Sequence, residues 1–119
     1  MPAMQHLTDG VLREKLYRAY VSRASTGDQD NGPIISEILM LKKERAQMLG
    51  YNTHADMSIA SKMASSVEEV DNLSKMLRIA SFDAAKKELA DIQAFAAKNG
   101  FEGKLALWDV PYWSERQKE

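Results

Sequence analysis

Residues 33–50 carry an apolar pattern with the period of an α-helix. The apolar residues recur at intervals of three and four, and they are Ile34, Ile35, Ile38, Leu39, Leu41, Met48 and Leu49. Pro33 suits a first helical turn, where its missing amide proton would have no partner. Gly50 suits the left-handed position that ends a helix. The apolar stripe is wide, which indicates burial on more than one side.

A second apolar face precedes this segment. Thr8 or Asp9 can accept hydrogen bonds from the free amides of a first helical turn, so we expect a helix to begin there. The apolar residues along it fall near one face, and they are Leu12, Leu16, Ala19, Tyr20 and Ala24. The basic side chains are expected mostly outside that face, and they are Arg13, Lys15 and Arg18. The polar residues 25–32 then predict a loop.

Helix-start signals continue in the second half of the chain. Thr53 with Asp56, and Ser66 with Glu69, have the spacing of a capping box. The first pair predicts a short helix, and the second predicts a longer one with an apolar face.

Another apolar face predicts a helix over residues 82–98, with Gly100 as its cap. The break at residues 81–83 is weak, and one continuous helix over both segments fits the pattern too. Asp109 is expected to cap a last helix. The predicted fold class is therefore all-α, a compact array of five or six helices without a sheet.

Composition narrows the classes of function. A chain of 119 residues is expected to form a single helical domain over 1–119. Its net charge of −1 offers no field that would attract nucleic acid or an anionic membrane. The absence of cysteine excludes disulfides and thiol catalysis. No signal peptide and no bilayer-spanning run is recognisable, so we expect a location in the cytoplasm or an organelle interior, without secretion.

Several short strings occur in a fixed order, and they are Arg23-Ala24-Ser25, Asp30-Asn31, Leu49-Gly50-Tyr51, Lys62-Met63-Ala64 and Trp108-Asp109. In order and spacing they resemble the helical part of the thimet oligopeptidase / oligopeptidase A family of zinc metallopeptidases, from about Leu12 to Glu119. The resemblance implies an α-helical peptidase that cuts short peptides inside a deep channel. It implies that this stretch helps to build the channel wall, and that zinc belongs to a full-length member.

The chain contains no His-Glu-x-x-His. That motif places two imidazoles one helical turn apart on one zinc, with a Glu that activates the bound water. The only histidines, His6 and His54, lie far apart and have no acidic or His neighbour at metal-ligand spacing. We therefore predict no catalytic, metal-binding or cofactor-binding residue in this chain. A fragment, a truncated gene product and half of a split enzyme all fit.

Lys42, Lys43 and Arg45 form a small basic cluster in the sequence. Glu37 and Glu44 lie beside it, so a solvated helix face is favoured over an anion site.

Aromatic residues gather near the end of the chain. Trp108, Tyr112 and Trp113 fall within six residues at spacings that bring them to neighbouring positions of one helical turn. They either close the core of this domain or form an interface with other polypeptide, where large aromatic side chains with a polar group are favoured. As partners we expect either the missing catalytic region or a second copy of the chain.

Two classes of function follow from the sequence. The chain is either a substrate-enclosing part of a zinc metallo-oligopeptidase, inactive alone, or a free-standing helical interaction module without a catalytic role. Short peptides are expected as partners only of a full-length enzyme.

Overall fold

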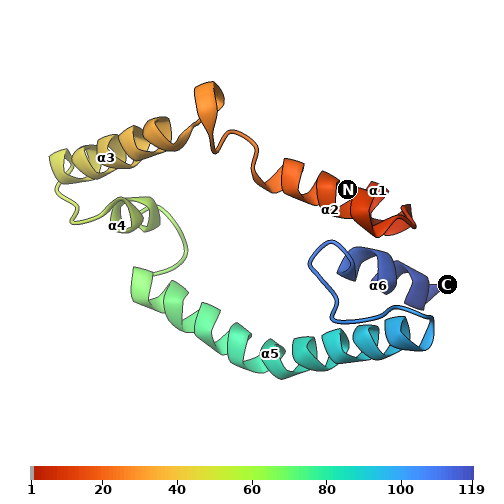
Figure 1. Cartoon of the computed structure of the whole chain (residues 1–119). Coiled ribbons are helices and arrows are strands. Elements are labelled where there is room, and N and C mark those ends of the chain that lie inside the picture. The colour runs from red at the N-terminus through yellow and green to blue at the C-terminus, as the bar shows by residue number, and fades with distance from the viewer. Residues whose placement is uncertain (1) are drawn as a thin grey trace. The chain divides into compact units, whose positions relative to one another are not determined.

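A computed structural model describes residues 2–119, which form six α-helices, one short 3-10 helix and no strand (Figure 1). The helices are α1 (Ala3–His6), α2 (Gly10–Val21), η1 (Gly27–Gln29), α3 (Gly32–Met48), α4 (His54–Ile59), α5 (Val67–Lys98) and α6 (Val110–Lys118). The predicted all-α class and the predicted number of helices are confirmed. The short helices α1 and η1 have no counterpart in the sequence-based prediction.

The chain divides into two units. Unit 1 comprises Met1–Arg23 with Ser81–Glu119, of which only Met1 lies outside the described residues, and unit 2 comprises Ala24–Ala80. Helix α5 contributes residues to both units. A single domain over 1–119 stays a prediction.

Local capping explains where the helices begin. The carboxylate of Asp9 accepts hydrogen bonds from the amides of Val11 at 2.8 Å and Leu12 at 3.2 Å, as expected for the cap of α2. Thr53 and Asp56 form a complete capping box at the start of α4. These two predictions are confirmed.

Helix α3 begins and ends as the sequence predicts. Pro33 lies in its first turn. Gly50, which follows the helix, has a φ of +81°, a conformation that costs a side-chain-bearing residue energy. The amide of Tyr51 then donates to the carbonyl of Ala46 at 2.9 Å, which turns the chain back along α3.

Helix α5 is continuous through residues 81–83, where the sequence indicates a weak break. No glycine or proline occurs between Val67 and Lys98, so nothing local interrupts the helix. At its start the amide of Glu69 donates to Ser66 Oγ at 3.1 Å. The Glu69 carboxylate accepts from both the amide and the hydroxyl of Ser65, at 2.6 and 2.8 Å, so it bonds one residue earlier than a capping box requires.

The buried core is small, and this corrects the expected compact packing. Among residues 2–119 the buried apolar side chains are Met4, Ala46 and Ala96. The wide stripe on α3, expected to be buried on more than one side, is instead exposed over 45–87% of each residue, and its members are Ile34, Ile35, Ile38, Leu39, Leu41, Met48 and Leu49. Helix α3 makes its contacts with the short helix α4, which is too small to cover such a stripe.

The predicted orientation of α2 is also wrong. Arg13, expected outside, is only 3% exposed, whereas Leu12, Leu16 and Tyr20 are 41%, 36% and 48% exposed. The cause is an acidic partner for Arg13 in unit 1.

None of the helices in residues 2–119 combines the length and apolar character needed to cross a bilayer.

Candidate functional site

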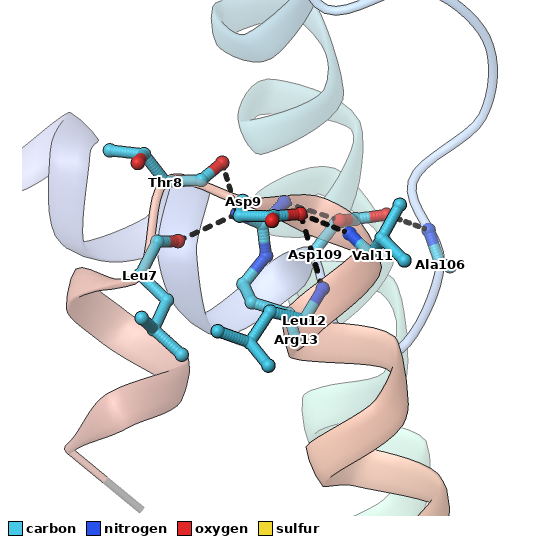
Figure 2. A network of polar contacts seen from close by, with 8 residues as sticks. All are labelled: Leu7, Thr8, Asp9, Val11, Leu12, Arg13, Ala106 and Asp109. Carbon is cyan, nitrogen blue, oxygen red and sulfur yellow. Dashed lines mark hydrogen bonds and ion pairs between the residues drawn. The ribbon is translucent and has the colours of Figure 1, made fainter.

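The most closely connected polar network of unit 1 surrounds Arg13, in the second turn of α2 (Figure 2). Its guanidinium donates from Nη1 to the carbonyls of Leu7, at 2.7 Å, and Thr8, at 3.0 Å. Nη2 donates to Asp109 Oδ1 at 2.7 Å. The two side chains of this ion pair are 3% and 7% exposed, so both charges depend on each other and on the backbone for solvation.

Asp109 holds the loop before α6. Its Oδ2 accepts a hydrogen bond from the amide of Ala106 at 3.1 Å. Asp109 makes no side-chain cap bond to α6, which corrects the expected capping role, because both carboxylate oxygens already have these other partners. Gly10 also lies against the network, since a Cβ there would come within 3.3 Å of Arg13 Nη2. A side chain at Gly10 would therefore push the guanidinium.

Aromatic side chains of α6 lie next to the polar network around Arg13. The Arg13 Cζ atom lies 4.5 Å from the centroid of the Tyr112 ring, within the range of a cation–π contact. The Tyr112 ring lies edge-on to Trp113 at 5.2 Å. Trp113 in turn contacts Phe101 at 5.8 Å and Phe95 at 6.3 Å between centroids. Its indole Nε1 is buried without a hydrogen-bond partner among the described residues.

Trp108 has separate neighbours on α2. Its ring lies 5.8 Å from that of Tyr17, and the Arg18 Cζ atom lies 5.0 Å from its centroid. Trp108, Tyr112 and Trp113 are all half-buried and all contact partners within unit 1. Tyr112 and Trp113 form one aromatic cluster and Trp108 belongs to another contact group, while part of each of the three side chains stays accessible. Their role in a partner interface stays a prediction.

The apolar periodicity of α2 does not predict that Arg13 is central to this site, because it places Arg13 among solvated basic residues. Asp109 is marked in the sequence by its place in the Trp108-Asp109 string. Chemically, the network positions helices. Arg13 and Asp109 bond to each other and to the backbone, while Arg13 Nε is buried without a hydrogen-bond partner among the described residues. No group of three His, Cys, Asp or Glu residues in 2–119 could hold a metal.

Comparison with known proteins gives a consistent result. The model of peptidase family M3 matches residues 3–119. The chain is 47% identical over 121 residues to the probable cytosolic oligopeptidase A of Arabidopsis thaliana, covering 100% of this chain and 17% of the relative. It is 47% identical to the chloroplastic/mitochondrial organellar oligopeptidase A of the same plant, over 100% of this chain and 15% of the relative. Oligopeptidase A of Salmonella typhimurium is 41% identical over 125 residues, covering 100% of this chain and 18% of the relative. The chain thus spans less than a fifth of the length of these relatives.

Proposed function

The chain belongs to peptidase family M3, and from this premise we propose that it is a helical, non-catalytic part of a zinc metallo-oligopeptidase. In the full-length enzyme, which hydrolyses short peptides, it forms part of the wall of the substrate channel. Alone, it has no peptidase activity. The three relatives named above are all called oligopeptidase A, which supports the class of reaction.

The residues of this chain do not fit a zinc site. A catalytic zinc needs three protein ligands and an open position for water. The chain has two histidines, no cysteine and no His-Glu-x-x-His, and residues 2–119 bring no three candidate ligands together. The zinc and the general base are therefore assigned to polypeptide other than residues 1–119.

The proposal rests on α2 and α3, where a charged side chain is buried and apolar side chains are exposed. On α2 a charged residue, Arg13, is buried, while the apolar Leu12 and Leu16 on the same helix are exposed. On α3 the whole apolar stripe is exposed. Apolar surface of this extent favours association because its burial removes it from water. Relatives of more than five times this length have additional polypeptide to cover such faces.

A free-standing interaction module is the alternative function. It is favoured by the Arg13–Asp109 pair, which closes unit 1 with partners that all lie inside the unit. Both functions use the exposed helix faces, but only the first requires a family enzyme as the partner. For location we propose the cytoplasm or an organelle interior, which agrees with the names of the two plant relatives.

The proposal is tested first on the purified chain. We expect no cleavage of a fluorescence-quenched oligopeptide with or without added Zn²⁺, and no stoichiometric zinc by metal analysis. Oligopeptidase A of Salmonella typhimurium, assayed under the same conditions, is the positive control. One tightly bound zinc per chain, lost when His6 or His54 is changed, would refute the proposal. Metal-dependent cleavage by a preparation cleared of contaminants would do so as well.

A further inference from the structure

Unit 2 contains an open groove of about 560 Å³ between the end of α3, the helix α4 and the turn that follows it. The backbone bond from Tyr51 to Ala46 brings α4 against the last turns of α3, where Ala46 is fully buried. This packing places Arg45, from α3, in the lining of the same groove as His54 and Lys62. Residues well separated in the sequence therefore meet around one hollow.

The polar lining of the groove is basic, and no Asp or Glu contributes to it. On α4, Asp56 Oδ2 accepts hydrogen bonds from the amide and hydroxyl of Thr53, at 3.1 and 2.7 Å. The guanidinium of Arg45, which has five N–H donors, makes no hydrogen bond or ion pair within residues 2–119. The cations of the groove therefore take part in no ion pair within the part of the chain that the structure describes.

Two further polar groups add to this arrangement. Lys62 Nζ donates to Ser58 Oγ at 2.7 Å, which fixes the ammonium at the groove while two of its three N–H donors stay available. His54 Nδ1 is buried and has no hydrogen-bond partner among the described residues. A buried polar atom is normally paired, so the side chain of His54, which lines the groove together with Arg45 and Lys62, keeps one polar atom that no described residue satisfies.

The groove is lined by apolar as well as basic side chains, which favours an anion with an apolar part. Leu49 and Met57 lie in the same lining as the basic groups. A carboxylate attached to an apolar residue would pair with the guanidinium and ammonium and place its hydrocarbon part against these side chains. We propose that this groove binds a polypeptide carboxylate. The carboxylate is either the free C-terminus of a peptide or an Asp or Glu side chain of a partner, and the inference holds whether or not the chain is part of a peptidase.

The test is an NMR titration of the full chain, with the amide signals of α3 and α4 and the ring signals of His54 as readouts. The probes are acetyl-Leu-Leu with a free carboxylate, acetyl-Leu-Glu-Leu-amide with a side-chain carboxylate, and acetyl-Leu-Leu-amide without one. We expect saturable shifts around the groove with one or both acids and none with the amide. The acid that binds identifies the source of the carboxylate. Equal shifts with the amide, or none with either acid, would overturn the proposal.

Charge-matched variants separate the groove from the general charge of the helix. Arg45→Gln should weaken binding of the acid about tenfold, the loss expected for one charge-assisted hydrogen bond. Lys42→Gln removes the same charge from α3 at a residue outside the lining and should change binding less than twofold. Circular dichroism of both variants checks that the helices persist. Equal weakening by both changes would overturn the proposal, and so would inorganic phosphate binding as tightly as the acids.

Discussion

Replacing Arg13 by Met tests whether the Arg13–Asp109 pair holds unit 1 together. Methionine keeps much of the apolar stem of the side chain and removes the guanidinium. The change removes the hydrogen bonds to the carbonyls of Leu7 and Thr8 and the ion pair with Asp109. It also leaves the Asp109 carboxylate, which is 7% exposed, without a counter-charge.

The expected loss of folding free energy follows from the burial of the Arg13–Asp109 pair. Breaking a buried pair by removing one partner costs about 3–5 kcal/mol, because the remaining charge is desolvated and unpaired. Arg18→Met is the matched control on the same helix, since the Arg18 side chain is 65% exposed and pairs with Glu14 at 2.7 Å. An exposed pair contributes about 0.2–1 kcal/mol, and the exposed contact with Trp108 about 0.5–1 kcal/mol more. We expect Arg13→Met to destabilise unit 1 by about 3–5 kcal/mol and the control by about 0.7–2 kcal/mol.

Urea denaturation followed by tryptophan fluorescence measures this difference. The only two tryptophans, Trp108 and Trp113, both lie in unit 1, so the signal reports that unit alone. With a slope of about 1 kcal/mol per molar urea, the midpoint should fall by about 3 M for Arg13→Met and by about 1 M for Arg18→Met. Adding Asp109→Asn to Arg13→Met should recover part of the loss, because no unpaired charge remains.

Two results would refute the reasoning. One is an equal midpoint for the Arg13 and Arg18 variants, which would show that burial of the pair has no energetic consequence. The other is a double variant whose loss of stability equals the sum of the losses in Arg13→Met and Asp109→Asn measured singly. Independent effects add, whereas the effects of coupled residues do not.

Two further changes test other parts of the structure. The hydrogen bonds from the amide and hydroxyl of Ser65 hold the pKa of Glu69 below its ordinary value of 4.5. These bonds stabilise the start of α5 fully at pH values above that ordinary pKa, and the stabilisation is lost as the pH falls through the lower pKa of the folded state. The first turn of α5 should therefore fray at low pH, and Glu69→Gln should abolish this pH dependence. Carboxyl NMR should record the lowered pKa of Glu69, and an ordinary pKa for this carboxyl would contradict the assignment. The double change Tyr112→Ser and Trp113→Ser should weaken self-association, or binding to the missing catalytic part, more than it weakens folding. Sedimentation and urea denaturation compare the two effects, and a strict monomer at high concentration with both indoles buried favours the aromatic residues as core instead.

The features that the sequence predicts correctly are local ones. Asp9 and Thr53 each bond to amides within three residues, so their roles can be read from spacing. Gly50 ends α3 because the positive φ required there is intrinsic to glycine. The continuity of α5 is also local in origin, but an absence of breakers is a weaker signal than a cap.

The features that the sequence does not predict depend on distant partners. Arg13 is buried because of Asp109, which lies 96 residues away in sequence, and no periodicity in α2 reports that contact. The same applies to the groove of unit 2, because its lining combines Arg45 and His54 from different helices, whereas Arg45 itself is exposed as predicted. The apolar stripes were identified correctly, whereas their expected burial requires covering elements that residues 2–119 do not supply.

A chimera tests whether this chain builds a non-catalytic part of a family M3 oligopeptidase. In oligopeptidase A of Salmonella typhimurium, the stretch that aligns with this chain over 125 residues at 41% identity is replaced by this chain. The control chimera carries the equivalent stretch of the probable cytosolic oligopeptidase A of Arabidopsis thaliana, and a third carries this chain with Ile38→Asp on the exposed stripe of α3. We expect metal-dependent hydrolysis of a quenched oligopeptide by the first two chimeras and loss of activity in the third. An active control beside an inactive first chimera, or full activity with Ile38→Asp, would contradict this expectation.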